Sequence, residues 1–203
     1  MINYIAFDLE TTGFSPQSDE IIQIGAWKIE QGVVADRFIC FVRPYRYIPK
    51  TVQNITGILM EDVATAETVE SVLPEFYDWS RGYPFLGHNL QFDYGFLISH
   101  GKRLGLDFTE NGARQGICTM KLAKHLLKLR NLKLENLVTH FNISVSGKPR
   151  WHQADFDAYM TKLVYDRFAF RYPVLDEVKM PASLQDKSTE YGEVTNNDTL
   201  SFI

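Results

Sequence analysis

Apolar residues follow two different spacings along the chain. Compact or alternating apolar runs predict strands at residues 4–7, 20–29, 33–42, 84–87 and 116–118. A turn at Gln31-Gly32 joins the second and third of these runs, so the first three strands are expected to form a meander. The run at residues 116–118 is expected to be the last strand.

Helical spacing alternates with the later strands. Apolar positions three and four residues apart predict helices at residues 69–79, 92–103, 120–127, 133–141 and 154–170. Strands alone, followed by strands mixed with helices, favour an α/β fold. We therefore expect a mixed β-sheet flanked by helices on both faces.

The composition is that of one globular domain. The chain has 203 residues, of which 45% are hydrophobic and 23% charged, and this excludes a long disordered or collagen-like protein. Residues 1–182 contain no low-complexity tract and are expected to form a single domain. Residues 183–203 carry four acidic residues against one lysine, and we expect a polar, flexible carboxy-terminal tail there.

The overall charge narrows the class of partner. The 21 basic and 25 acidic side chains give a formal charge of −4, so an anionic substrate would need a local basic patch or a metal ion. The chain has no apolar run near the roughly 18 residues that cross a bilayer and no basic leader, which predicts a soluble, cytoplasmic protein without membrane partners. Cys40 and Cys118 lack a CxxC spacing and are expected to be reduced, buried thiols.

Two carboxylates stand at the end of the first predicted strand. Alternation places Asp8 and Glu10 on the same face, with Leu9 on the other. A strand-terminal Asp can simply form a turn, but two carboxylates that share a buried face repel each other unless a cation or a proton lies between them. Mg²⁺ is a hard cation that prefers such oxygen ligands.

Two more acids begin apolar helix faces. Asp93 shares a face with Phe96 and Leu97, and Asp157 shares one with Met160 and Val164. An acid in the first turn can merely complement the helix dipole. However, four acids from three apolar segments are most simply reconciled if they converge on divalent metal ions.

A histidine precedes the last of these acids. His152 lies in the expected loop before the helix that contains Asp157, where its ring is free to reach a water near that carboxylate. Two metal ions held by carboxylates can clamp a phosphate, and a neutral histidine can take the proton of the attacking water. The other histidines lack this context and are expected to be structural or on the surface: His88, His100, His125 and His140.

Three ordered motifs carry a family resemblance. They lie at residues 7–14 (FDLETTGF), 87–97 (GHNLQFDYGFL) and 152–157 (HQADFD). With these motifs, the sequence resembles the DEDDh 3′→5′ exonucleases, which include the proofreading epsilon subunit of bacterial DNA polymerase III and exonuclease X. The similarity covers about residues 3–170 and is specific because all three motifs occur in order.

The resemblance implies an RNase H-like fold and a set of site residues. The implied ligands of two Mg²⁺ or Mn²⁺ ions are Asp8, Glu10, Asp93 and Asp157, and the implied general base is His152. The positions at which the family meets the 3′-terminal nucleotide are Thr11, Thr12, Phe14 and Asn89. The sequence departs from the family pattern at Trp151 and Gln153, where basic residues are common, and at Asp155, which adds an acid.

Basic and aromatic residues suggest how a nucleic acid strand is bound. Lys148 and Arg150 precede His152 and are expected to meet the scissile phosphate. Lys121, Lys124 and Lys128 are either a solvated helix face or a phosphate track. Phe14 either stacks against the terminal base or fills the core.

The expected activity is metal-dependent 3′→5′ hydrolysis of DNA, of proofreading or repair type, that releases nucleoside 5′-monophosphates from single-stranded or frayed 3′ ends. An exoribonuclease of the same superfamily remains an alternative, because the 2′-OH is read by the shape of the site. A noncatalytic adapter of DNA ends or polymerases is the alternative from another class. A DNA polymerase is a candidate partner, and the apolar end at residues 199–203 is a candidate sliding-clamp peptide.

Overall fold

The computed structural model describes residues 2–109, 116–145, 147–173 and 185–186. Within them, six strands form one sheet in the order β3-β2-β1-β4-β5-β6. Their bounds are Tyr4–Thr11 (β1), Ile21–Glu30 (β2), Val33–Phe41 (β3), Phe85–Gly87 (β4), Gly116–Cys118 (β5) and Gln185–Asp186 (β6).

The first three strands form the expected meander. β1 pairs antiparallel with β2, and β2 pairs antiparallel with β3 across the Gln31-Gly32 turn, where both residues have positive φ angles of 51° and 84°. β4 runs parallel to β1 and β5 parallel to β4. The sheet is therefore mixed, as the sequence predicts, and β1 continues beyond its last parallel pair with β4, which joins Ala6 and Leu86.

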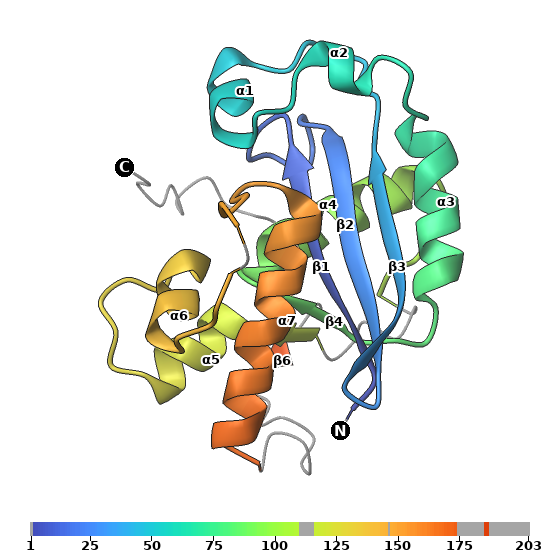
Figure 1. The fold of residues 1–203 in the computed structure, drawn as a ribbon. Coiled ribbons are helices and arrows are strands. Elements are labelled where there is room, and N and C mark those ends of the chain that lie inside the picture. The colour runs from blue at the N-terminus through green and yellow to red at the C-terminus, as the bar shows by residue number, and fades with distance from the viewer. Residues whose placement is uncertain (1, 110–115, 146, 174–184, 187–203) are drawn as a thin grey trace.

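Helices cover both faces of the sheet (Figure 1). Their bounds are Lys50–Thr56 (α1), Met60–Val63 (α2), Val69–Ser80 (α3), Leu90–Arg103 (α4), Thr119–Leu126 (α5), Leu134–His140 (α6) and Ala154–Arg171 (α7). Ile5, Phe7 and Leu9 pack in one core cluster with residues of α3 and α4. Tyr4 and Ala6 pack in a second cluster with residues of α5, α6 and α7. Alternating residues of β1 thus face opposite layers.

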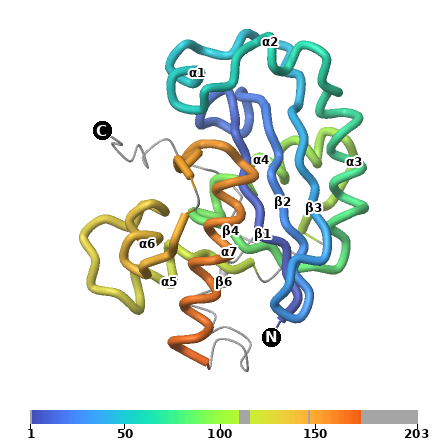
Figure 2. The backbone as a smooth tube through the Cα atoms, in the orientation of Figure 1, coloured from blue at the N-terminus to red at the C-terminus, as the bar shows by residue number. Residues whose placement is uncertain are grey.

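Two short helices close one end of the sheet, and the apolar pattern did not predict them. α1 and α2 follow β3, and a small cluster of Ile22, Ile48, Ile58 and Val63 anchors them. The smooth trace in Figure 2 places this cap over the end of the sheet where β1 ends. Helices of seven and four residues are too short to show a helical period, so only tertiary contacts define them.

Other expectations concern the last strand, the cysteines, the tail and membrane spans. The prediction that residues 116–118 form the last strand is wrong, because β6 pairs antiparallel with β5. Cys40 and Cys118 are free thiols, and Cys118 is buried, whereas Cys40 is half-buried and burial raises its pKa to about 11. Apart from β6, the predicted tail lies outside the described residues, and the domain boundary at residue 182 stays a prediction. Among the residues described, no helix has the length and apolar character needed to span a membrane.

Candidate active site

The end of β1 carries the first two acids. Asp8 and Glu10 lie on the face of β1 that also carries Ala6, which packs towards α7 and its neighbours. They pair across the sheet with Gly25 and Gln23 of β2, respectively. Glu10 is 8% exposed and Asp8 is half-buried, so both carboxylates are largely withdrawn from water.

The third acid reaches the same point from α4. Asp93 is 3% exposed, and its Oδ1 accepts a hydrogen bond of 3.1 Å from the backbone amide of Leu9, which lies between the two acids of β1. The last parallel pair between β1 and β4 is Ala6 with Leu86, so this hydrogen bond lies beyond the part of β1 that pairs with β4. It fixes the Asp93 carboxylate beside the end of β1.

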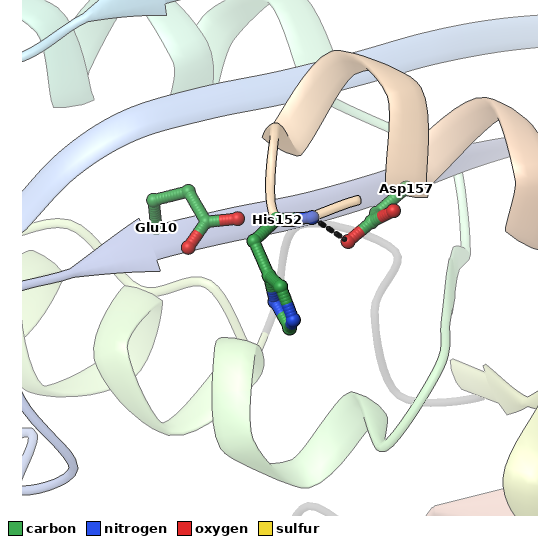
Figure 3. A group of neighbouring side chains, drawn as sticks. All are labelled: Glu10, His152 and Asp157. Atoms are coloured by element: carbon green, nitrogen blue, oxygen red, sulfur yellow. Dashed lines mark hydrogen bonds between the residues drawn. The ribbon is translucent and has the colours of Figure 1, made fainter. Parts of the chain in front are cut away.

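The fourth acid and the histidine come from the start of α7. Asp157 is 9% exposed, and its Oδ2 accepts a hydrogen bond of 3.0 Å from the backbone amide of His152. His152 itself is exposed and has a φ of 61°, a conformation that side chains with a Cβ rarely adopt. Figure 3 shows the imidazole directed away from this bond, in the space beside Glu10.

β2 holds the start of α7 against the sheet, and the sequence reasoning missed this contact. Gln23 Oε1 accepts a hydrogen bond of 2.9 Å from the backbone amide of Ala154, and Trp27 Nε1 donates one of 2.8 Å to the carbonyl of Asp155. A Cβ atom on Gly25 would lie 2.2 Å from the carbonyl carbon of Ala154. Only glycine permits this approach, and a glycine within a predicted strand was the one signal for it.

The electrostatics of the four carboxylates are coupled. Burial, followed by the charges of neighbouring acids, raises the pKa of Asp8 well above its usual value and that of Glu10 to about 8. Burial also raises the pKa of Asp93 to about 8 and that of Asp157 to about 7, although hydrogen bonds from backbone amides oppose both shifts. Without a cation, the site therefore favours protonated acids.

The donor set fits a divalent metal ion. Carboxylate oxygens of Glu10 and Asp157 and a ring nitrogen of His152 lie within 4.8 Å of one another. Asp157 Oδ1 is buried and has no hydrogen-bond partner among the described residues. An orphaned buried carboxylate oxygen is costly unless a cation or an ordered water satisfies it. The acids of β1, α4 and α7 together form an oxygen-rich site of the kind that hard cations prefer.

The residues expected at the terminal nucleotide lie around this group. Thr11 and Thr12 are buried at the end of β1, where Thr12 Oγ1 accepts a hydrogen bond of 2.9 Å from the backbone amide of Glu20. Asn89 precedes α4 in a left-handed conformation with a φ of 62°. Phe14 is 81% exposed, and its ring lies edge-to-face with that of the half-buried Phe92 at 6.2 Å between centroids, so it does not fill the core.

The basic residues differ in their surroundings. Lys148 and Arg150 are exposed on the segment before His152, and Arg150 forms a 2.8 Å ion pair with Asp155. The prediction that three lysines share one helix face is wrong for Lys128. Lys121 and Lys124 belong to α5, but the helix ends at Leu126, so Lys128 lies beyond it.

The other histidines are structural or on the surface, as expected. His88 Nδ1 is hydrogen-bonded to Thr119 Oγ1 at 2.9 Å, and burial lowers its pKa to about 4. His100 Nε2 donates to the carbonyl of Asp19, and burial lowers its pKa as well. His125 and His140 are exposed on α5 and α6.

A mixed sheet with four clustered acids and a histidine at the end of its first strand fits an enzyme that binds divalent metal ions. The family model RNase_T, described as Exonuclease, matches residues 5–165, and the chain belongs to this exonuclease family. The resemblance that the three sequence motifs indicated is thereby confirmed.

Known relatives agree with this assignment. The DNA polymerase III PolC-type protein of Thermotoga maritima is 40% identical over 166 residues, which are 81% of this chain but 12% of that protein. The chain thus spans about an eighth of the length of this relative. Among solved structures, exonuclease X in complex with 5′ overhanging duplex DNA superposes with a TM-score of 0.64 at 24% identity, covering 84% of this chain and 93% of that one.

A second solved structure supports the fold. The nuclease domain of 3′hExo, a DEDDh family member bound to rAMP, has a TM-score of 0.71 at 21% identity and covers 84% of this chain and 92% of that one. At these identities the two structures establish the fold. The predicted RNase H-like architecture, with helices on both faces of a mixed sheet, is confirmed.

Proposed function

We propose that this chain is a metal-dependent 3′→5′ exonuclease that releases nucleoside 5′-monophosphates from the 3′ ends of DNA. The observation that carries the proposal is the convergence of four acids from β1, α4 and α7, one of which has an orphaned buried oxygen. Burial and, after it, the charges of neighbouring carboxylates raise the pKa of Asp8 and Glu10, and a divalent cation would relieve both effects. Membership of the exonuclease family supports the reaction class.

The four acids share one task in this proposal. Asp8, Glu10, Asp93 and Asp157 hold two Mg²⁺ or Mn²⁺ ions, and the amides of Leu9 and His152 orient two of the carboxylates. When bound, such ions supply a nucleophilic water at neutral pH and stabilise the charge on the leaving oxygen. Burial of the acids excludes bulk water and strengthens these electrostatic effects.

His152 acts as the general base. Its ring is exposed and close enough to Glu10 and Asp157 to meet a water held between them. The same closeness permits imidazole to be a metal ligand instead. We favour the base, because the four carboxylates already provide the oxygen ligands that Mg²⁺ prefers and an exposed ring can release its proton to solvent.

The substrate is proposed to be a single-stranded or frayed 3′ end of DNA. Thr11, Thr12 and Asn89 border the acids and would hold the terminal nucleotide, Phe14 would stack on its base, and Lys148 and Arg150 would contact the scissile phosphate. The names of two relatives, a DNA polymerase and exonuclease X in complex with DNA, support DNA. The rAMP in the 3′hExo structure keeps an exoribonuclease as the second candidate.

The biological setting is proposed to be proofreading or repair. The similarity to a PolC-type polymerase supports a DNA polymerase as a partner. The candidate clamp peptide at residues 199–203 lies outside the described residues and stays a prediction. A noncatalytic adapter is disfavoured, because this chain retains all four acids and the histidine.

Product analysis tests the proposal. Purified protein is incubated with a single-stranded DNA oligonucleotide in Mg²⁺ or EDTA, and the products are separated by chromatography and identified by mass. The proposal requires nucleoside 5′-monophosphates that appear only with metal. Release of nucleoside 3′-monophosphates or of internal fragments would overturn it.

A further inference from the structure

The segment between β3 and α1 exposes basic and aromatic side chains. Tyr45, Arg46, Tyr47 and Lys50 are exposed and form what we call the basic-aromatic strip. Pro44 and Ile48 are buried and anchor it. Residues 37–60 contain four basic side chains and no acid, although the whole chain has a formal charge of −4. The strip is therefore a basic stretch of an acidic chain, and the carboxylates that touch it, Glu20 and Glu70, accept hydrogen bonds from its backbone amides and from the Tyr45 hydroxyl rather than pairing with its basic side chains.

Glu20 fastens the strip to the end of β1. Its carboxylate accepts hydrogen bonds from the backbone amides of Tyr45 and Arg46 at 3.1 and 3.0 Å. Glu20 is also joined to Thr12 by two hydrogen bonds, in which the Thr12 amide donates to the Glu20 carbonyl and the Glu20 amide donates to Thr12 Oγ1. Thr12 lies two residues beyond Glu10, about 7 Å along an extended chain.

Two further contacts place the strip between the turn that follows Phe14 and the loop that carries His152. Arg46 Nη1 donates a hydrogen bond of 3.0 Å to the carbonyl of Ser18, in the turn that follows Phe14. At the other end, α1 begins at Lys50, and the carbonyl of its last residue, Thr56, accepts a 2.9 Å bond from Gln153, the neighbour of His152. Figure 2 shows α1 at the end of the sheet where β1 ends.

The exposed side chains have the chemistry of a single-strand binding surface. Tyr45 and Tyr47 are 70% and 67% exposed, which leaves aromatic faces open to water. Bases stack on such rings, and this contributes about 1–3 kcal/mol per base. Arg46 and Lys50 supply positive charge for backbone phosphates. Arg46 donates to a carbonyl and Lys50 to Gln53 Oε1 at 3.5 Å, and among the described residues no ion pair neutralises either charge.

We propose that the basic-aromatic strip binds the nucleic acid strand on the 5′ side of the terminal nucleotide. The inference rests on the proposed exonuclease function, because that function places a single strand at the end of β1. Aromatic and arginine side chains also suit protein interfaces. Residues 37–60 contain no acid, and the strip is attached to the turn around Thr12. Both observations favour a nucleic acid strand over a protein as its partner. Longer strands should therefore bind more tightly and be cleaved more efficiently than dinucleotides.

The first test measures binding without turnover. A fluorescent dT12 oligonucleotide is titrated in EDTA with wild type and with the double variant Tyr47→Ala/Lys50→Gln. Both positions are exposed, so the fold should persist, which circular dichroism checks. We expect the Kd to rise about tenfold, equivalent to about 1.4 kcal/mol. The slope of log Kd against log salt should fall by about 0.7 for the lost phosphate contact.

The matched control changes the same residue classes elsewhere. Phe170 is 86% exposed at the far end of α7, and Arg81 lies just before β4, which starts beside the start of β1 and so at the opposite end of the strands from the site. The double variant Phe170→Ala/Arg81→Gln should bind dT12 like wild type. Equal binding by the strip variant and wild type would overturn the proposal, as would an equal loss in the control.

The second test separates this proposal from the proposed function. With Mg²⁺, the ratio of kcat/KM for dT12 to that for a dinucleotide should fall about tenfold in the strip variant. If wild type hydrolyses neither substrate, the proposed function fails, and the binding result alone decides the strip. If wild type hydrolyses both and the ratio stays the same, the strip proposal fails and the function stands. Loss of a polymerase contact with dT12 binding intact would also overturn the strip as a strand site.

Discussion

The backbone amide of His152 donates a 3.0 Å hydrogen bond to Oδ2 of Asp157, so one turn of chain fixes the proposed base relative to a proposed metal ligand. His152 holds a left-handed conformation with a φ of 61°, which sets its side chain apart from the bond (Figure 3). The other oxygen of Asp157 is buried and meets no hydrogen-bond partner in the part of the chain that the structure describes. The backbone of His152 thus orients the acid, and its ring is left for chemistry.

This relationship predicts that His152→Ala separates catalysis from metal binding. The amide that holds Asp157 is kept, so the metal ligands should stay in place. Loss of the proton acceptor should lower kcat by about 10²–10⁴-fold. Steady-state kinetics on single-stranded DNA measures kcat, and calorimetric titration with Mn²⁺ measures metal affinity. A large loss of Mn²⁺ affinity would instead make His152 a ligand.

The raised pKa values predict that the metal-free protein loses stability as the pH rises. Burial raises the pKa of Glu10 and Asp93 to about 8 and that of Asp157 to about 7, whereas in the unfolded chain they titrate near 4. Between about pH 4 and pH 8 the folded protein therefore binds more protons than the unfolded chain, and the free energy of unfolding falls across this window. In EDTA, the Tm should be lower at pH 8 than at pH 5.

Asp93→Asn provides the control for this prediction. Asparagine keeps an oxygen for the amide of Leu9 but cannot ionise, so the Tm in EDTA at pH 8 should rise. Each unit of relieved pKa shift is worth about 1.4 kcal/mol, or about 3–5 °C for a domain of this size. Mg²⁺ should raise the Tm of wild type at pH 8 and have a smaller effect on the variant. A Tm in EDTA that increases from pH 5 to pH 8 would contradict the account.

The sequence predicted the site wherever local periodicity decides the direction of a side chain. Alternation along β1 places Asp8 and Glu10 on one face, because side chains of a strand have a period of two. Helical spacing placed Asp93 and Asp157 on the buried faces of α4 and α7. Both arguments need only a few neighbouring residues, so they predict the direction of a side chain without knowledge of the fold.

Periodicity could not predict contacts between distant segments. The approach of α7 to Gly25 depends on how a helix crosses the sheet about 130 residues later in the chain, and nothing near Gly25 specifies it. α1 and α2 are too short to show a period. Lys128 was grouped with Lys121 and Lys124 by helical spacing alone, although the helix predicted at residues 120–127 already ended before it, and α5 ends at Leu126.

The contact at Gly25 predicts an indirect effect on catalysis. In Gly25→Ala, the added Cβ would clash with the backbone of Ala154, so the first turn of α7 must shift and carry His152 and Asp157 with it. A displacement near 1 Å is enough to lower kcat about 100-fold. Gly95→Ala is the matched control, because its Cβ would meet only Pro16 at an ordinary 3.4 Å. Measurement of kcat and Tm for both variants checks this prediction. An equal kcat in the two variants would show that the close approach of α7 to Gly25 is not needed for catalysis.

The exposure of Phe14 predicts a role in substrate binding. The ring is 81% exposed, so Phe14→Ala removes little core packing and should leave the Tm nearly unchanged. Loss of stacking on the terminal base should raise KM for single-stranded DNA about tenfold, with metal affinity unaffected. Initial rates over a range of oligonucleotide concentrations measure KM. An unchanged KM would remove Phe14 from the site.

One measurement tests the central claim most directly. Matched 5′-labelled single-stranded DNA and RNA are incubated with wild type or Asp8→Ala, in Mg²⁺ or EDTA, and the products are resolved on a gel. The account predicts a ladder that shortens one nucleotide at a time from the 3′ end of DNA, faster than of RNA, and that requires both metal and Asp8. A ladder that persists in EDTA or in Asp8→Ala would contradict the account, as would bound DNA that wild type never shortens.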